Sequence, residues 1–214
     1  MRRIAFYGGT FDPPHIGHLA IAEKLLKTFS LDEFVFVPAY HAPHKARIEP
    51  TSPYDRFAML CLASADMPTV SVSRIEVELP EKPYTVETLA RIKAIYPDDK
   101  IFFVMGADSW MDICSWREWE HVLLMTDHIV VTRPGITVST EHVSDAVRKR
   151  IVDVRGAQDV SVLDERSHIY LTDAVNIDIS ASKIRTRICE GSHDWSSDVP
   201  ITVANYIEKY HLYS

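Results

Sequence analysis

The sequence predicts an α/β fold: a doubly wound parallel sheet with helices on both faces and a small C-terminal helical extension. Short apolar runs rich in β-branched and aromatic residues alternate along the chain with segments of helical periodicity. The runs at 34–37 and 101–105 are almost continuously apolar, which is typical of strands buried on both faces of a sheet. Because right-handed crossovers join strands that alternate with helices, the sheet is expected to be parallel.

The runs and periodic segments give the expected elements in order. Strands are expected at 4–7, 34–37, 70–79, 101–105 and 128–132, with a weaker one at 168–171. Helices are expected near 16–29, 54–64, 86–95 and 116–124. Ser52 and Pro53 form an N-cap and N1 pair before the second helix, and Ser115 with Glu118 forms a capping box before the fourth. Residues 136–165 are more polar and less periodic, and we expect a helix and a connection there.

Length, charge and composition exclude several classes of protein. The 214 residues, 46% of them hydrophobic, suit one large domain, or one domain with a small extension, around a substantial core. The net charge of −7 argues against a nucleic-acid partner. No apolar run approaches membrane-spanning length and the apolar start is too short for a signal peptide, so we expect a cytoplasmic protein without a membrane partner. The three cysteines lie far apart without a C-x-x-C motif, so we expect them to be small buried residues.

The most informative segment follows the first strand, where residues 8–19 read GGTFDPPHIGHL. Two glycines at a strand exit let the backbone turn sharply and approach a ligand closely. The helical spacing of the apolar residues that follow puts His15 and His18 one turn apart at a helix start, on roughly the same side. A helix start offers unpaired N–H groups and partial positive charge that suit phosphate, and imidazoles add further donors. The segment therefore predicts a phosphate site.

This segment resembles the signature of the nucleotidyltransferase superfamily. Its core, His15-Ile16-Gly17-His18, also occurs in class I aminoacyl-tRNA synthetases, which bring the α-phosphate of ATP to an attacking oxygen and expel pyrophosphate. The chain has no G-x-x-x-x-G-K-[ST], so a P-loop is not the source of phosphate binding. It also lacks a G-x-G-x-x-G after the first strand, so a hydride-transfer dinucleotide fold is not supported.

A second phosphate-site candidate reads ISASKIR at residues 179–185. Ser180 is a plausible N-cap and Gly191 ends the helical run at a suitable distance. This places two hydroxyls and Arg185 at another helix start, where Arg185 could grip phosphate with two parallel hydrogen bonds. The segment resembles the I-S-x-[ST]-x-I-R motif of the same superfamily. We therefore expect a Rossmann-like nucleotidyltransferase core at 1–178 and a C-terminal helical part at 179–214 packed on it.

Three further segments narrow the family. Residues 37–45 end the second strand in a proline-punctuated loop that delivers Lys45, and residues 83–89 open a helix. Gly106-Ala107-Asp108 follows the fourth strand, with Trp116 eight residues beyond Asp108. Together with the turn at 133–135 and the ending PITVANYIEKYHLY, they resemble the bacterial nicotinate-nucleotide adenylyltransferases over nearly the whole chain, apart from about 136–165. Arg117 stands where an aromatic residue is frequent in that family.

The resemblance implies transfer of the adenylyl group of ATP to nicotinate mononucleotide with Mg²⁺, giving deamido-NAD and pyrophosphate in NAD biosynthesis. It implies catalytic roles for His15, His18, Lys45 and Arg185. The ATP-binding residues that it implies are Gly8, Gly9, Thr10, Phe11, His15, Gly17, His18, Gly106, Asp108, Ile179, Ser180, Ser182 and Arg185. The nicotinate mononucleotide-binding residues that it implies are Lys45, Tyr84, Thr85, Asp108, Trp116, Arg117 and Arg133.

The chemistry of such a reaction agrees with the residue types present. The nucleophile is a phosphate oxygen that is already anionic, so no general base is needed, and no Ser–His–Asp or Cys–His constellation is found. The enzyme must hold two polyanions in line and stabilise charge, which requires cationic donors. Magnesium binds through the substrate phosphates, so no carboxylate cage is expected. Asp12 and Asp108 are better suited to ribose hydroxyls or to water-mediated metal contacts.

The sequence leaves several alternatives open. A sister adenylyltransferase could act on the amide mononucleotide or on phosphopantetheine, although the phosphopantetheine enzymes normally lack the features at 83–89 and Trp116. A truncated synthetase is disfavoured because the chain has no room for a tRNA-binding domain and no basic surface. A non-catalytic nucleotide sensor is disfavoured because both histidines, Lys45 and Arg185 are retained. The sequence allows a homo-oligomer but does not determine the oligomeric state.

Overall fold

The computed structural model, which describes residues 1–40, 50–79, 83–132, 138–160, 166–173 and 179–213, contains one seven-stranded sheet with parallel pairing throughout. The strands are β1 (Arg3–Gly9), β2 (Glu33–Pro38), β3 (Val70–Val72), β4 (Lys100–Gly106), β5 (Asp127–Val131), β6 (Ile151–Asp153) and β7 (Ile169–Thr172). Their order is β3-β2-β1-β4-β5-β7-β6. The chain therefore winds outward from β1 in one direction and from β4 in the other. The switch point between β1 and β4 is where doubly wound sheets bind ligands, beyond the carboxyl ends of the strands.

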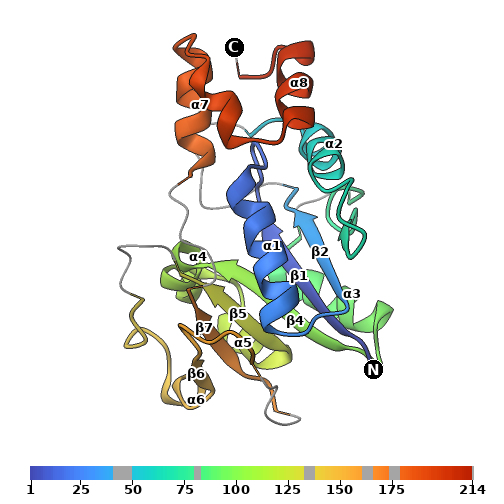
Figure 1. Cartoon of the computed structure of the whole chain (residues 1–214). Helices are drawn as coiled ribbons and strands as arrows, with labels where there is room; N and C mark the ends of the chain where they lie inside the picture. Colours follow the sequence, from blue (N-terminus) through green and yellow to red (C-terminus); the bar gives the residue numbers. More distant parts are fainter. Residues whose placement is uncertain (41–49, 80–82, 133–137, 161–165, 174–178, 214) are drawn as a thin grey trace.

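Helices cover both faces of the sheet, which confirms the predicted fold class. They are α1 (Ile16–Thr28), α2 (Pro53–Ala63), α3 (Thr85–Ile95), α4 (Ala107–Met111), α5 (Trp119–Met125), α6 (Asp145–Arg148), α7 (Ala181–Cys189) and α8 (Ile201–Tyr210), with 3₁₀ turns η1 (Ile113–Ser115) and η2 (Asp194–Asp198). In Figure 1, α7 and α8 (orange to red) lie at the end of the molecule toward which β1 and β2 point, and α8 lies beside α2. The C-terminal helices thus stand at the carboxyl edge of the sheet.

The side chains of β1 supply both halves of the core. Ile4 and Phe6 belong to a buried cluster that includes residues of α3 and α5, whereas Ala5 and Tyr7 belong to a cluster that includes residues of α1. Successive side chains of a strand point to opposite faces, so β1 is buried on both sides. Full burial of a large apolar side chain contributes about 1.5–3 kcal/mol, which explains why this strand reads as a continuous apolar run.

A third apolar cluster joins the C-terminal helices to α2. Met59 of α2, Ile184 of α7, and Val203 and Ile207 of α8 are all buried in it. The two predicted caps in this part of the chain are confirmed: the Oγ atom of Ser180 accepts from the Lys183 N–H, and Gly191 follows α7 with φ of 71°. A division of the chain at residue 178 stays a prediction, because residues 174–178 lie outside the described residues.

Two predicted elements are wrong in extent. The predicted strand at 70–79 pairs only over Val70–Val72, because the chain then turns, with Glu78 N–H donating to the Arg74 carbonyl. Alternating polarity beyond residue 72 reflects a turn that buries Val77, not a strand. The predicted helix at 116–124 begins at Trp119, and Ser115 bonds backward to the Asp112 carbonyl instead of capping it. The Ser52–Pro53 start of α2 is confirmed.

The remaining differences concern isolated features. All three cysteines lie at exposed positions, contrary to the expectation of burial, since a lone residue carries no periodicity that could place it. The segment 136–165 contains the short helix α6 as expected, but it also contains the strand β6, which was not predicted. A three-residue edge strand of this kind gives too few alternations to be recognised. Residues 136, 137 and 161–165 of that segment lie outside the described part of the chain.

Candidate active site

The turn from β1 into α1 is made by Phe11, and not by the glycines as expected. Phe11 has φ of 51°, whereas Gly8 and Gly9 lie within β1. A Cβ atom on Gly8 would lie 2.9 Å from the Phe103 ring, and one on Gly9 would lie 2.7 Å from the Phe11 ring. The two glycines are therefore required by the packing of aromatic rings beneath the loop. Because the Phe11 side chain is buried in the core, only its backbone is left to face a nucleotide.

His15 and His18 form a stacked pair at the start of α1, as the spacing predicts. Their ring centroids are 3.6 Å apart, and His15 is the N-cap residue. The His15 backbone N–H donates to Nδ1 of His18 over 3.2 Å. A neutral His18 ring therefore carries its proton on Nε2, which makes that atom a donor. The ring of Phe11 meets the His18 ring edge-on at 4.9 Å, and Gly17 is buried within the same turn.

The second motif reaches the first one through Arg185. Its Nη1 atom donates to the Asp12 backbone carbonyl at 2.5 Å, and its Nη2 atom donates to the Ser182 hydroxyl at 3.4 Å. A guanidinium has five N–H donors, so these two bonds orient Arg185 without exhausting it. This bond brings the start of α7 close to the start of α1, although Arg185 and Asp12 are 173 residues apart in the sequence. Ile179, before the Ser180 cap, packs against the third apolar cluster.

Arg56 ties the loops around these motifs together. It is fully buried on α2 and donates to three backbone carbonyls, those of Thr10 (2.7 Å), Thr51 (2.9 Å) and Tyr40 (3.1 Å). Burial lowers the pKa of this guanidinium, and the nearby charge of Asp12 opposes that shift. Arg56 is not among the residues that the sequence motifs predict for the site. An arginine within the apolar face of a predicted helix was the signal that could have revealed it.

The carboxylate of Asp12 is used inside the chain, contrary to the expectation that it serves ribose hydroxyls or a hydrated metal. Oδ1 accepts from the Tyr213 hydroxyl at 2.6 Å, and Oδ2 accepts from the Thr51 N–H at 3.2 Å. The second predicted acid, Asp108, is exposed on α4 next to Gly106. A Cβ atom built on Gly106 meets no described atom within 4 Å, so none of the described residues fills the space beside Gly106 at the end of β4.

Four of the predicted mononucleotide-binding residues come from the start of α3 and from the segment ahead of α5. Tyr84 is the N-cap of α3, and its N–H donates to Oε2 of Glu87 at 3.0 Å. Arg117, ahead of α5, places its guanidinium carbon 4.8 Å from the centre of the Tyr84 ring and lies 3.5 Å from Oε1 of Glu87. The backbone N–H group of Thr85 lies in the first turn of α3, where the helix has no carbonyl to accept from it. The neighbouring Trp116 is partly buried against the core.

Two predicted site residues cannot be located. Lys45 and Arg133 lie outside the described residues. Within the part that the structure describes, no group of three or more His, Cys, Asp or Glu side chains is arranged to hold a metal ion. No helix of that part is long and apolar enough to cross a membrane.

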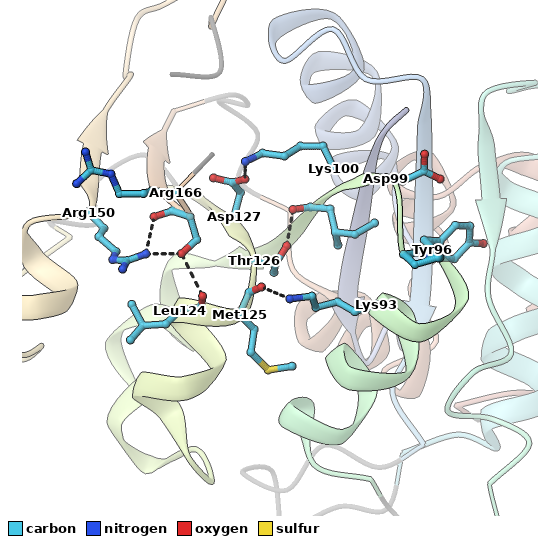
Figure 2. A pocket seen from close by; sticks show the side chains of 13 residues that line it. Lys93, Tyr96, Asp99, Lys100, Leu124, Met125, Thr126, Asp127, Arg150 and Arg166 are labelled. Atoms are coloured by element: carbon cyan, nitrogen blue, oxygen red, sulfur yellow. Dashed lines mark hydrogen bonds and ion pairs between the residues drawn. The ribbon is translucent and has the colours of Figure 1, made fainter. Parts of the chain in front are cut away.

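A cavity of about 390 Å³ lies at the opposite edge of the sheet, between the C-terminal ends of α3 and α5 and the amino ends of β4 and β5 (Figure 2). Lys93 donates to the Met125 carbonyl at the end of α5, and Lys100 pairs with Asp127. Arg150 donates to Ser167. Lys100 neutralises a buried acid and Lys93 binds a helix C-terminus, so contacts within the fold account for these two cations. The cavity is not part of the candidate active site.

The fold and the two neighbouring helix starts define the class of protein: an α/β protein of the nucleotidyltransferase type. A family model described as cytidylyltransferase-like matches residues 6–187. Two curated relatives carry the name "Probable nicotinate-nucleotide adenylyltransferase": one from Citrifermentans bemidjiense (36% identity, 99% of this chain and 98% of the relative) and one from Streptomyces coelicolor (34%, 96% and 98%). The chain therefore belongs to the cytidylyltransferase-like family and, within it, to the nicotinate-nucleotide adenylyltransferases.

A solved structure shares the fold. It is the Plasmodium falciparum nicotinic acid mononucleotide adenylyltransferase complexed with NaAD, with a TM-score of 0.74 at 22% identity, covering 100% of this chain and 98% of that one. The same enzyme complexed with APC gives a TM-score of 0.71 at 22% identity, covering 100% and 98% of the two chains. At 22% identity this similarity shows a shared fold, in agreement with the α/β architecture described above.

Proposed function

We propose that this protein transfers the adenylyl group of ATP to nicotinate mononucleotide and releases pyrophosphate, giving deamido-NAD in NAD biosynthesis. The observation that carries the proposal is the bond from Arg185 to the Asp12 carbonyl, which brings the second motif to the first. Two helix N-termini, two imidazoles and a guanidinium then converge on one region, which suits a triphosphate. The names of the relatives and their coverage of nearly the whole chain support the same activity.

His18 is the proposed donor to the transition state. Because Nδ1 accepts the His15 N–H, a neutral ring carries its proton on Nε2, which we propose as the donor to a phosphoryl oxygen on which charge develops. His15 and Arg185 are the proposed contacts to the ATP phosphates, together with the backbone of residues 8–11 and the hydroxyls of Ser180 and Ser182. The incoming phosphate oxygen of the mononucleotide is already anionic, so positioning in line is sufficient and no base is required.

The donor set favours a magnesium ion that arrives with ATP. The two motifs offer imidazole, guanidinium and backbone N–H groups, and the Asp12 carboxylate is engaged by Tyr213 and Thr51. The ion would thus be held by the phosphates and by water, which Mg²⁺ retains readily. When bound, it would neutralise charge on the phosphates that leave as pyrophosphate.

The start of α3 supports nicotinate as the preferred ring. A carboxylate accepts from helix-start N–H groups, whereas an amide would turn its own NH₂ group toward donors. Arg117 adds a cation at the same helix start, where Oε1 of Glu87 lies near its guanidinium and Oε2 of Glu87 accepts the Tyr84 N–H. Lys45, Arg133 and Asp108 remain proposed contacts of the mononucleotide, with Trp116 as the flat wall beside its ring.

The decisive experiment supplies the purified protein with ATP and Mg²⁺, and with nicotinate mononucleotide, nicotinamide mononucleotide or phosphopantetheine. Pyrophosphate release and the mass of the dinucleotide product are measured. We expect the highest rate of product formation with nicotinate mononucleotide. Turnover of phosphopantetheine alone would assign a sister reaction, and nucleotide binding without product would assign a sensor. We also propose that the protein is cytoplasmic. Analytical ultracentrifugation in the same buffer would measure whether it forms a homo-oligomer.

A further inference from the structure

The Asp12–Tyr213 contact links the C-terminal segment to the nucleotide-binding loop. The Tyr213 hydroxyl donates to Oδ1 of Asp12 at 2.6 Å, while the backbone carbonyl of the same Asp12 accepts from Arg185 at 2.5 Å. Asp12 therefore accepts from the Tyr213 hydroxyl through its carboxylate and from the Arg185 guanidinium through its main-chain carbonyl. Asp12 itself is 5% exposed, so its carboxylate depends on partners within the chain.

Tyr213 is itself held in place by several elements. Its backbone carbonyl accepts from the thiol of Cys189 on α7, the helix that carries Arg185. Its φ of 68° lies in the left-handed region, which is unfavourable for a tyrosine and is retained only where surrounding contacts impose it. Burial, followed by the Asp12 carboxylate, raises the pKa of the Tyr213 hydroxyl, so it stays protonated and donates at any ordinary pH.

We propose that Tyr213 is a positioning residue of the nucleotide site, which acts through Asp12 to orient Arg185 toward the ATP phosphates. The Tyr213 hydroxyl and the Thr51 N–H fix the two carboxylate oxygens of Asp12, and this fixes the peptide whose carbonyl receives Arg185. Without the hydroxyl, the buried carboxylate turns to find another donor and the carbonyl moves with it. The inference rests on the proposed role of Arg185 on ATP.

The chain contains a matched control for this contact. Tyr206 on α8 donates to Oδ1 of Asp55 on α2 at 2.7 Å. This is the same Tyr–Asp chemistry, and it also fastens the C-terminal part to α2. Asp55, however, has no bond to the first motif in the part of the chain described here. The pair of variants Tyr213→Phe and Tyr206→Phe therefore separates positioning of Arg185 from simple attachment of the C-terminal helices.

The experiment measures the affinity of a non-hydrolysable ATP analogue by calorimetry, the KM for ATP and kcat, and the melting temperature of each variant. We expect Tyr213→Phe to weaken binding of the analogue about tenfold, as for a charge-assisted hydrogen bond felt in part at the site. The Tyr206→Phe variant should stay within about twofold of the wild type. The KM for nicotinate mononucleotide should be unchanged in both.

A double-mutant cycle with Arg185→Lys tests the route of the effect. If Tyr213 acts through Arg185, then Tyr213→Phe adds little in the Arg185→Lys background. An equal loss in both backgrounds, or equal effects of Tyr213→Phe and Tyr206→Phe on ATP affinity, would overturn the inference. Should Arg185→Lys by itself leave ATP affinity unchanged, the proposed role of Arg185 fails instead.

Replacement of Tyr213 by 4-aminophenylalanine guards against loss of folding. It keeps the ring and a donor N–H, so ATP affinity should return close to that of the wild type. A folded 4-aminophenylalanine variant with the same weakened affinity as Tyr213→Phe would count against a role of the donor.

Discussion

His18 has its donor atom fixed by one backbone hydrogen bond, and this makes the consequence of removing it specific. The His18→Ala variant loses a donor aimed at developing charge, so kcat should fall by about two to three orders of magnitude. Nucleotide affinity should change far less, because the loss falls on the transition state. Steady-state kinetics and calorimetry with ATP measure the two effects, and exposed His121 gives the control His121→Ala. Near-normal turnover of His18→Ala would refute the assignment.

Arg56 shows how much one buried side chain can hold. The Arg56→Met variant would leave the carbonyls of Thr10, Thr51 and Tyr40 without their donor. Each buried polar group left unsatisfied costs about 1–3 kcal/mol, so we expect a loss of several kcal/mol in the free energy of unfolding. Urea unfolding measures it, with exposed Arg74→Met as the control. A loss below about 1 kcal/mol would mean that water replaces the guanidinium in these bonds.

At the scale of the element, the N-terminus of α3 should set the choice between the acid and the amide. We expect a preference for nicotinate over nicotinamide mononucleotide of at least about a hundredfold in kcat/KM. This is the effect expected when backbone N–H groups and the NH₂ group of the amide face one another and two polar groups stay unpaired. Arg117→Ala should reduce this ratio, because it removes a cation from the helix start. The reduction should be at most about fivefold, because the Arg117 side chain is half exposed and ion pairs of exposed side chains are weak.

The matched variant for this helix start is Trp116→Ala, which removes apolar surface without changing charge. It should weaken both mononucleotides and leave the ratio largely intact, since the two rings have nearly the same shape. Competing-substrate assays give the ratios directly. Equal use of the two mononucleotides by the wild type would refute the helix-terminus argument even if adenylyl transfer itself is observed.

For the whole molecule, acid sensitivity should follow from His128 in the middle of the sheet. It is fully buried on β5, its Nδ1–H donates to the Thr126 carbonyl at 3.0 Å, and the Phe103 ring lies 5.9 Å away. Burial lowers the pKa of His128 to about 4, so between pH 6.5 and 4 the unfolded chain binds a proton that the folded chain does not. The free energy of unfolding should therefore fall by about 3 kcal/mol as the pH drops through this window.

Urea unfolding between pH 4 and pH 7 tests this expectation. The His128→Gln variant, which cannot gain a proton, should be less stable at pH 7 but should lose most of the slope between pH 6.5 and 4. A slope in the variant equal to that of the wild type would assign the acid sensitivity to other groups.

The fold and the first half of the site were predictable because they depend on local chemistry. Continuous apolar runs predicted strands buried on both faces, and the H-x-x-H spacing placed His15 and His18 in one turn, where they stack at 3.6 Å. The caps at Ser52, Ser180 and Gly191 depend on neighbouring residues alone, and all three are confirmed. At 70–79 and at Ser115 the prediction was wrong because the local signal was ambiguous. A turn can show the same alternation of polar and apolar residues as a strand, and it can contain the same residue types as a helix N-cap.

By itself the sequence determined the alternation of strands and helices, the two helix starts and the family, since each rests on residues close together in the chain. Only the tertiary structure decided which groups Asp12, Arg56, Arg117 and Tyr213 contact. Asp12 meets Tyr213 across 201 residues, and Arg56 meets Thr10 across 46. Contacts of such separation form when the sheet and its helices pack, because burial then forces each polar group to find whichever partner the fold brings near it.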